Sequence, residues 1–342
     1  MRGAGSAPLI ISDKGKEEEE VALRIIKRFF FSCVTIFFVI AFNFFLFRVM
    51  PGNVETIIAK ANTSETVKAR LMAEAGLDQP IMTQFGIYLE KLLTGDFGES
   101  FYTYDGSSNV LAIIAGRLPN TVILLLCAEV VAILLGLLIG VICAQKRGSK
   151  LDTGLLSGSL VLYSMPTFWF AMLLIFFFCV IFRIFPTGGI TTPGTNYQGW
   201  MHIQDYLRHM ILPMLCMGLL MIGVYAVTMR STMMNILTED YINTARAKGF
   251  STKYILLHHA IPNAMVPMAT IIALNIAAVL GGAIQLETLF SWQGLGQLMY
   301  EALNRRDYPV LQGCFFVSTV AVILANFIMD SIYGFIDPRV KS

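Results

Sequence analysis

Long apolar segments separated by polar loops dominate the chain and predict its helices. A helix that crosses a hydrocarbon core of about 30 Å needs about 20 residues. Six segments reach that length, at residues 29–50, 119–144, 160–182, 211–229, 265–285 and 310–332. The first is too long for a cleaved signal peptide, and no small-residue cleavage site follows it before Arg48 and Pro51. We therefore expect an all-α, polytopic membrane protein with six transmembrane helices.

Composition excludes a soluble or a disordered chain. Hydrophobic residues make up 56% of the 342 residues and charged residues only 14%, whereas globular proteins carry about 25% charged residues. The cysteines stand singly, without the CxxC spacing of zinc sites or of small disulfide frameworks, so we interpret them as small buried hydrophobes. They are Cys33, Cys127, Cys143, Cys179, Cys216 and Cys314.

The distribution of basic residues predicts the orientation. A net charge of +2 is too slight to indicate nucleic-acid binding. Fifteen lysines and arginines lie on the side that carries both termini, against four in the two short loops opposite. The positive-inside rule gives little weight to the long first loop and places the basic side in the cytoplasm. Both termini are therefore expected to be cytoplasmic.

The first outer segment is too polar to cross a membrane and too long for a simple turn. Within it, apolar residues recur at helical spacing from Ile81 to Leu92, with Asp78 as a candidate N-cap, Pro80 in the first turn and Gly95 as the stop. This pattern predicts an amphipathic helix that lies on the membrane or on a partner.

The most informative stretch is the cytoplasmic loop EDYINTARAKGFSTKYILLHHAIPNAMVP, which begins at Glu239. Its first half predicts a short helix that ends at Gly249, where glycine can adopt the left-handed cap. A second short helix is expected to end at Pro262. Periodicity leaves two interpretations open: a knob that another protein grips, or an ordinary interfacial loop. The positions that define the two helices are Tyr241, Ile242, Ala245, Tyr254, Leu257 and His258.

Several motifs in order resemble one transporter family. Ala245, Gly249 and Pro262 have the spacing of the coupling loop of ABC importer permeases. The wider pattern resembles the B-type subunit of the dipeptide, oligopeptide and nickel permeases from about residue 23 onward. It rests on YINTARAKGF from Tyr241, ETLFSWQGLGQL from Glu287, RRDYPVLQG from Arg305, NFIMDSIYGFIDPR from Asn326, AGLDQP from Ala75 and LLTGDFGES from Leu92. Asn243 departs from this pattern, because the older motif has Glu there.

This resemblance implies an ABC type I importer permease fold without chemistry of its own. It also implies a homologous second permease, two ATPase subunits that bind ATP and magnesium, an extracytoplasmic substrate-binding protein, and the plasma membrane of a bacterium or archaeon. The sequence agrees, because it contains no G-x-x-x-x-G-K-[ST] phosphate loop. Family members carry peptides, nickel chelates, glutathione or related solutes. A secondary transporter or channel that works alone, and a scaffold or receptor, are the rival readings.

The expected organisation has four parts. Residues 1–22 form a charged, solvated cytoplasmic tail that contains KGKEEEE, and 23–50 form the first transmembrane helix. Residues 51–118 are extracytoplasmic. Residues 119–342 form a five-helix core with its coupling loop at 233–262.

The resemblance assigns two sets of candidate contacts. The ATPase-coupling set, in which the small Ala245 is expected to permit close approach, is Tyr241, Ala245, Arg246, Lys248, Gly249 and Pro262. The set for the binding protein is Gly95, Asp96, Gly98, Arg306, Asp307 and Tyr308.

Candidate residues for a substrate pathway are Glu129, Ser164 and Pro166. Glu129 lies deep in the second span, where a charge costs roughly 2.5–3.5 kcal/mol. It either meets a peptide ammonium group or pairs with a buried partner. Pro166 is expected to kink the third span, for the pathway or for packing.

Three further features have structural interpretations. The G-x-x-x-G patterns at 136–140 and 154–158 predict close helix packing. Asn326 and Asp330 share a helix face and are expected to contact the segment at 337–339. The histidines lack further ligands at suitable spacing, so no metal site is expected at His202, His209, His258 or His259.

Overall fold

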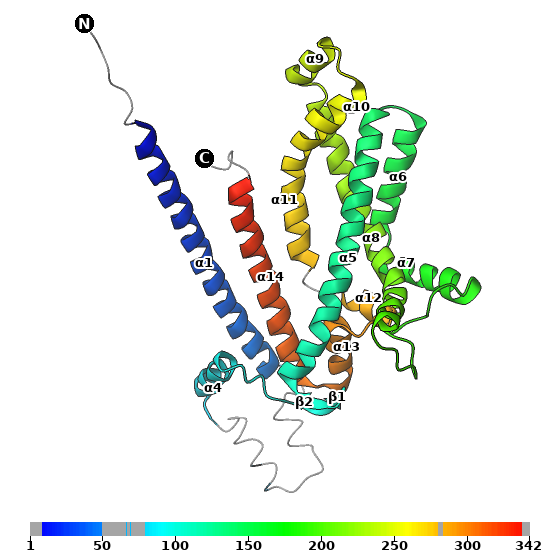
Figure 1. Ribbon diagram of the computed structural model, residues 1–342. Helices are drawn as coiled ribbons and strands as arrows, with labels where there is room; N and C mark the ends of the chain where they lie inside the picture. Colours follow the sequence, from blue (N-terminus) through cyan, green and yellow to red (C-terminus); the bar gives the residue numbers. More distant parts are fainter. Residues whose placement is uncertain (1–8, 50–65, 67–68, 70–78, 280–282, 337–342) are drawn as a thin grey trace.

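The chain folds into a bundle of long helices with short helices and one β-hairpin at its ends (Figure 1). This computed structural model describes residues 9–49, 66, 69, 79–279 and 283–336. The long helices are α1 (Leu9–Val49), α5 (Val110–Gln145), α8 (Trp200–Ile236), α11 (Ile261–Val279) and α14 (Tyr308–Ile336). The shorter ones are α4 (Ile81–Leu93), α6 (Lys150–Ser164), α7 (Thr167–Leu174), α9 (Asp240–Ala247), α10 (Thr252–Ile255), α12 (Ile284–Leu289) and α13 (Leu295–Arg305).

The number and type of membrane-spanning elements agree with the sequence prediction. In the described part of the chain, 5 helices are long and apolar enough to cross a membrane. The pair α6 and α7, with the π-helical turn η1 (Ile175–Ile181), adds a sixth span if it is counted as one. The polytopic, mostly helical fold is therefore confirmed.

Helices α5 and α8 form the centre of the bundle. A Cβ on Gly140 of α5 would lie 2.5 Å from the Cβ of Met229 on α8, and one on Gly136 would overlap the Cβ of Tyr225. Glycine removes this obstacle, so the two backbones approach closely. The close packing expected at 136–140 is confirmed. At Gly154 and Gly158 no described atom of this chain lies within 4 Å of a Cβ placed there, so the packing expected at 154–158 stays a prediction.

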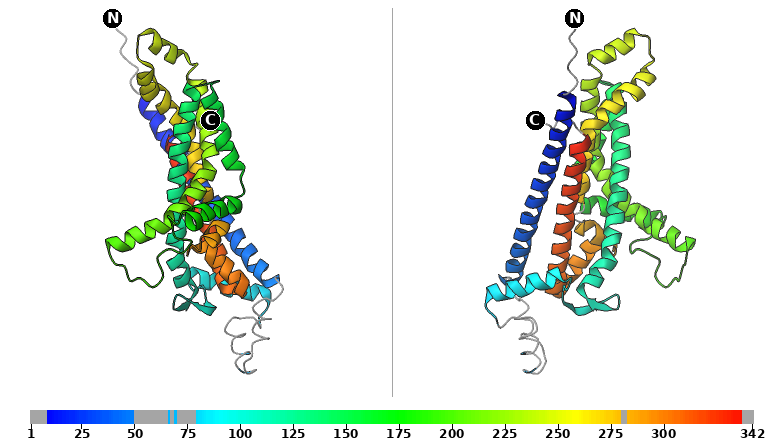
Figure 2. Two further views of the ribbon diagram at one scale, coloured as in Figure 1. Left: turned by 90° about the vertical axis from the view of Figure 1, so that its right-hand side faces the viewer. Right: turned by 60° about the vertical axis from the view of Figure 1, so that its left-hand side comes forward.

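The first helix is longer than the sequence predicted. It begins at Leu9, so the part of the expected mobile tail that the structure describes is helical. All residues of the charged run KGKEEEE except Gly15 are Glu or Lys, which both favour helix. Farther along, α1 runs beside α14, where the ring centroids of Phe47 and Tyr308 lie 6.1 Å apart (Figures 1 and 2).

The third span breaks at Pro166. Its two parts, α6 and the α7–η1 segment, meet at 105°. Pro166 lies at the N-cap of α7, where its missing N–H leaves no helical hydrogen bond unmade. The predicted kink is confirmed as an elbow, and the α7–η1 arm projects from the bundle (Figure 2). The bend is therefore sharper than a kink within one continuous helix, because α6 ends at Ser164 and α7 begins at Thr167.

The opposite end of the bundle carries the outer elements. Helix α4 packs Phe85 and Tyr88 against Phe44 of α1, with ring centroids 5.3 and 5.4 Å apart. This confirms the predicted amphipathic helix. It ends before Gly95, which has a φ of +76°. Pro80 is its N-cap and not part of its first turn, and Asp78 lies outside the described residues.

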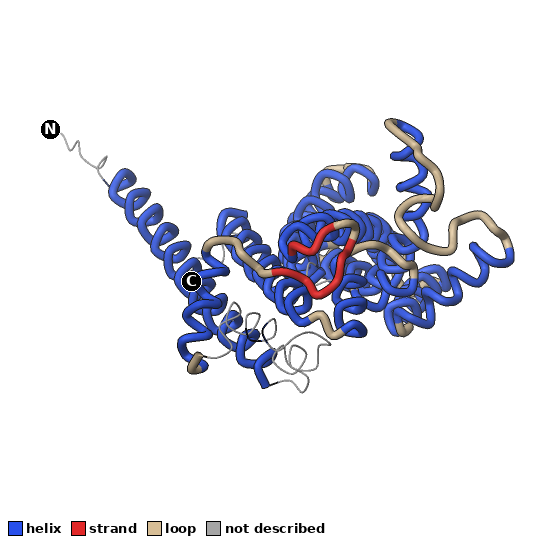
Figure 3. Tube along the Cα trace, turned by 90° about the horizontal axis from the view of Figure 1, so that it is seen from below, coloured by secondary structure: helices blue, strands red, loops and turns tan. Residues whose placement is uncertain are grey.

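A hairpin of β1 (Glu99–Tyr104) and β2 (Ser107–Asn109) follows, which the all-α prediction did not contain. It lies across the end of the bundle (Figure 3). Helix α5 then begins at Val110, inside the predicted outer segment 51–118. The side chain of Asn109 caps it by accepting a hydrogen bond from Ala112 N at 2.9 Å. The hairpin therefore fixes the residue at which α5 begins.

The span expected at 265–285 is displaced toward the N-terminus. Helix α11 is described over Ile261–Val279, and α12 begins separately at Ile284, after Ala283 as its N-cap. Helices α12 and α13 then lie at the outer end of the bundle, where α13 packs against α5 and α14 and α12 packs against α7 and α8 (Figure 1). The predicted contact of Asn326 and Asp330 with residues 337–339 falls on a segment outside the described residues.

Orientation gives a first testable prediction. Described parts of α1 and α14 near both termini lie at the same end of the bundle as α9 (Figure 1), and the basic side of the chain predicts that this end is cytoplasmic. In spheroplasts of a variant without native cysteines, Arg147→Cys should resist an impermeant thiol reagent, whereas Thr195→Cys should react. Both positions are exposed in the structure. Rapid labelling at position 147 and protection at 195 would reverse the topology.

Candidate functional site

The cytoplasmic segment between α8 and α11 has the conformation that its motif predicted, with one correction. Helix α9 ends before Gly249, which has a φ of +82° and so takes the left-handed cap. Helix α10 follows and continues through the π-helical η2 (Leu256–Ala260) into α11. The second helix therefore does not end at Pro262. A proline inside a helix removes one helical hydrogen bond, and the π-helical η2 directly precedes the turn that contains Pro262.

Helix α9 has a buried face and an exposed face. Ile242 is fully buried and Ala245 is 6% exposed. Both pack with Met229, Met233 and Leu256 of the same chain. Ala245 therefore lets α9 sit close to its own bundle, and its place in the ATPase-coupling set stays a prediction.

The exposed face of α9 carries Tyr241, Asn243, Thr244, Arg246 and Lys248. Partial burial and the nearby Glu239 raise the pKa of the Tyr241 phenol. A neutral tyrosine beside two cationic side chains offers a partner protein both apolar area and positive charge. This face, and not the alanine, is what the loop presents outward.

An aromatic stack that the sequence analysis missed extends this surface. Tyr254 stacks on Phe250 at 4.8 Å and on His258 at 4.3 Å between ring centroids. Phe250 and Tyr254 are 44% and 41% exposed. The four-residue spacing of these rings was the available signal. No group of three or more metal-ligating side chains occurs among the described residues, the histidines here included.

Glu129 has a partner inside its own chain. It is 3% exposed on α5 and accepts a hydrogen bond from the Tyr225 hydroxyl on α8. This contact joins α5 to α8 at membrane depth. The structure thus supplies the buried partner that the sequence left open, and a contact with a peptide ammonium group stays a prediction.

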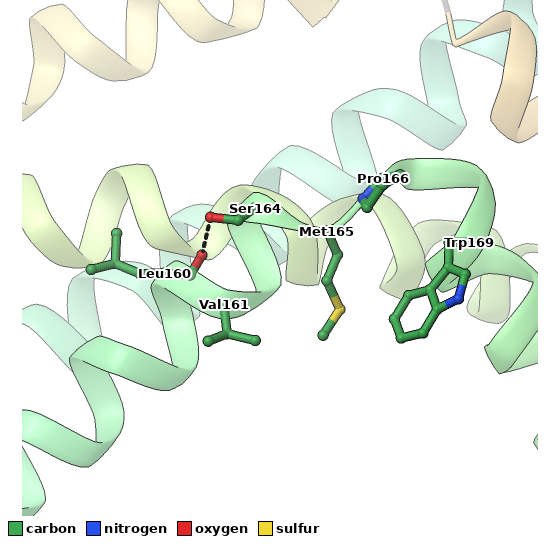
Figure 4. Close-up of a pocket in the computed structure, with 6 residues that line it drawn as sticks. All are labelled: Leu160, Val161, Ser164, Met165, Pro166 and Trp169. Atoms are coloured by element: carbon green, nitrogen blue, oxygen red, sulfur yellow. Dashed lines mark hydrogen bonds between the residues drawn. The ribbon is translucent and has the colours of Figure 1, made fainter.

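An open hollow of about 640 Å³, called here the elbow cavity, lies against the elbow of the third span. Figure 4 shows its lining, in which the Ser164 hydroxyl donates to the Leu160 carbonyl at 2.8 Å. Two of the three pathway candidates, Ser164 and Pro166, therefore lie together, while Glu129 does not line this cavity. The wall suits apolar groups. Its residues are Leu160, Val161, Ser164, Met165, Pro166 and Trp169.

The outer candidates divide into exposed and buried residues. After α4, the N–H of Gly98 donates to Asp96 Oδ1 at 2.9 Å, and Gly98 has a φ of +79°. Asp96 and Arg306 are exposed. By contrast, Asp307 is fully buried and Tyr308 is 4% exposed. These two therefore do not form an exposed surface for a binding protein.

Asp307 instead fastens the hairpin to α14. It accepts a hydrogen bond from the Ser100 hydroxyl at 2.5 Å. The Arg305 guanidinium lies over the rings of Tyr102 and Tyr104, at 5.6 and 5.1 Å. Burial and the Asp307 carboxylate raise the pKa of Tyr104. The RRDYP motif is thus explained by hairpin attachment.

Glu287 is a second buried carboxylate that the site prediction did not include. Its oxygens accept hydrogen bonds from Thr121 Oγ1 at 2.7 Å and from Gln297 N at 3.0 Å. Burial raises the pKa of this carboxyl. A Cβ on Gly294 would lie 2.5 Å from both Glu287 Oε2 and Thr121 Oγ1. The ETLFSWQGLGQL segment therefore holds α12 and α13 against α5 through the buried Glu287 carboxylate.

Comparison with known proteins identifies the family of this chain. The family described as "Binding-protein-dependent transport system inner membrane component" matches residues 136–342. This chain belongs to that family. The amino-terminal part of such membrane components matches residues 22–125. The chain is therefore a multi-pass inner-membrane permease of a binding-protein-dependent ABC transport system, in a non-catalytic family that implies ATPase and binding-protein partners.

Named relatives cover most of the chain. The di/tripeptide transport system permease protein DppB of Pseudomonas aeruginosa is 37% identical over 324 residues, 90% of this chain and 95% of the relative. The oligopeptide transport system permease protein AppB of Bacillus subtilis is 34% identical over 322 residues, 94% of this chain and 100% of the relative.

A solved structure shows the same fold. The inward-facing MetNI methionine ABC transporter matches with a TM-score of 0.54 and 17% identity, over 68% of this chain and 99% of that chain. At this identity the likeness supports the permease fold and nothing about substrate. It confirms the importer permease architecture expected from the motifs.

Proposed function

We propose that this chain is the transmembrane permease subunit of an ATP-driven importer for di- or oligopeptides. The observation that carries the substrate class is the 34–37% identity to peptide permeases over nine-tenths of the chain. In this role the chain forms the translocation pathway together with a second, homologous permease. Both termini lie in the cytoplasm, as the basic loops predict.

The loop at 233–262 couples the pathway to the ATPases. Its outward face, with Tyr241, Arg246 and Lys248, supplies the contact surface. Gly249 turns the chain at the end of that face, and Ala245 seats the helix on the bundle. Pro262 lies in the first turn of α11. A displacement of the loop therefore moves a transmembrane helix directly, because η2 continues into α11 without a break.

Substrate and binding-protein contacts are assigned to the other two candidate sets. Ser164 and Pro166 shape the elbow cavity that we place on the pathway. The turn with Gly95, Asp96 and Gly98, together with Arg306, faces the binding protein. Asp307 and Tyr308 support that surface from behind. The proposed boundaries are 1–22, 23–50, 51–118 and 119–342, with the observed start of α5 at Val110 lengthening the second span toward the outer face.

Substrate class is tested in cells that lack their own peptide importers and carry the full transporter. We expect uptake of a labelled dipeptide that excess unlabelled di- and tripeptides inhibit, while free amino acids and nickel chelates do not. A matched strain whose permease gene is deleted sets the background. Uptake inhibited by nickel chelates or free amino acids and not by peptides would contradict the proposed substrate.

Glu129 gives the sharpest test of the pathway. Glu129→Gln preserves an acceptor for the Tyr225 hydroxyl but removes the negative charge. If the carboxylate meets the peptide ammonium group, uptake of a free dipeptide should fall about tenfold, while uptake of its N-acetylated form stays unchanged. The assembled complex should still hydrolyse ATP. An equal loss for both peptides would assign Glu129 to structure alone.

A further inference from the structure

A buried ion pair joins α6 to α8 near the cytoplasmic end of the bundle. Arg230 holds Asp152 with two hydrogen bonds, Nε to Oδ1 at 2.7 Å and Nη2 to Oδ2 at 2.8 Å. The Asp152 side chain is 4% exposed. Gly148 N donates to Oδ2 at 2.9 Å. A carboxylate held by a two-pronged arginine and a backbone N–H has a strongly preferred geometry.

The same two helices are locked a second time near the elbow. A Cβ on Gly223 of α8 would lie 2.7 Å from the Cβ of Tyr163 and 2.8 Å from the carbonyl of Ser159 on α6. Helix α6 is thus fixed to α8 at both ends of its length. At 1.5 Å per residue its 15 residues reach about 22 Å. Its far end carries Ser164, which lines the elbow cavity.

Arg230 also lies next to the seat of the coupling helix. Met229 and Met233 flank it on α8 and pack against Ile242 and Ala245 of α9. A displacement of α9 therefore acts on α8 within one helical turn of the ion pair. The pair is the polar contact that ties this part of α8 to α6 in the described chain.

We propose that Asp152 and Arg230 are positioning residues that make the elbow follow the coupling loop. They act as a clamp: movement of α9 shifts the end of α8, the ion pair carries α6 with it, and the cavity at Ser164–Trp169 changes shape. The inference rests on the proposed ATP-driven transport. It goes beyond it by naming the contact that connects the motor side to the third span.

Removing the clamp should separate transport from hydrolysis and leave the bundle folded. The tight α5–α8 packing at Gly136 and Gly140 involves neither side chain of the pair. In liposomes with the complete transporter, Asp152→Asn and Arg230→Gln should each lower peptide uptake per ATP hydrolysed about tenfold. The double variant should be no worse than either single one, because both changes remove the same interaction.

The matched control removes an ion pair elsewhere. Arg117 Nη2 lies 2.8 Å from Asp105 Oδ2 at the outer end, and the Asp105 side chain is 65% exposed. Asp105→Asn should keep the wild-type ratio of uptake to hydrolysis. Additive losses in the double variant, or uptake and hydrolysis falling together in every variant, would overturn the clamp.

A second readout follows the elbow itself. In a variant without native cysteines, thiol labelling of Ser164→Cys should change between the nucleotide-free and the ATP-trapped complex, and Asp152→Asn should abolish that change. A nucleotide-dependent change that persists in Asp152→Asn, or no change in the parent, would contradict the proposal. Lack of ATP-driven peptide uptake by the wild-type complex would instead contradict the proposed function, while the labelling still tests the clamp.

Discussion

Ala245→Asp should lower ATP-driven peptide uptake about a hundredfold, which corresponds to about 2.8 kcal/mol. Ala245 is 6% exposed and packs on Met229, Met233 and Leu256. A carboxylate placed there has no charged partner in that cluster, and burying it without one is strongly unfavourable. Helix α9 would therefore leave its seat, and the outward face with Tyr241 would lose its position.

The measurement is uptake and phosphate release by the same reconstituted complex. The nucleotide sites belong to other chains, so isolated ATPase subunits should bind nucleotide normally. Stimulation of hydrolysis by the binding protein should disappear in Ala245→Asp. Ala245→Ser is the matched control, because it adds one small hydroxyl and should retain most of the activity. Near-normal stimulated hydrolysis and uptake in Ala245→Asp would remove the loop from the coupling mechanism.

Gly140→Leu should prevent stable folding of the bundle. A Cβ at this position meets not only Met229 but also the backbone of α8, at 2.9 Å from the carbonyl of Ala226 and 3.0 Å from Arg230 N. Backbone atoms cannot move aside as a flexible side chain can, so the two helices must separate. Overpacking of this kind costs typically about 1–3 kcal/mol or more. We expect the yield of purified complex to lose most of its wild-type value.

Gly116→Leu on the same helix is the control. No described atom lies within 4 Å of a Cβ at Gly116. Size-exclusion yield and the thermal midpoint in detergent compare the two variants directly. Equal yields and equal midpoints would show that the α5–α8 contact is less tight than the structure has it.

The features that the sequence predicted are those set by local pattern. Apolar length defines the spans, and Pro166 favours a break in the third because proline removes a helical hydrogen bond. Gly249 was predicted correctly because a positive φ at a helix end favours glycine. The Asp105–Gly106 pair was also a usable hairpin signal, yet it was missed within the polar stretch before α5.

The features that the sequence could not predict depend on contacts between distant residues. Glu287 meets Thr121 across 166 positions, and Glu129 meets Tyr225 across 96. No periodicity within one helix indicates which side chain on another helix will face it. The same limit explains Ala245, whose small size was compatible with a partner protein or with its own bundle until the packing of Met229 and Met233 was seen.

Peptide uptake into liposomes tests the account most directly. The chain, its second permease, the ATPases and the binding protein are reconstituted together, and uptake of a labelled dipeptide is followed with and without ATP inside the cytoplasmic compartment. We expect accumulation only when ATP, the ATPases and the binding protein are all present. Equal accumulation by this chain alone without ATP would contradict the account and identify a secondary transporter.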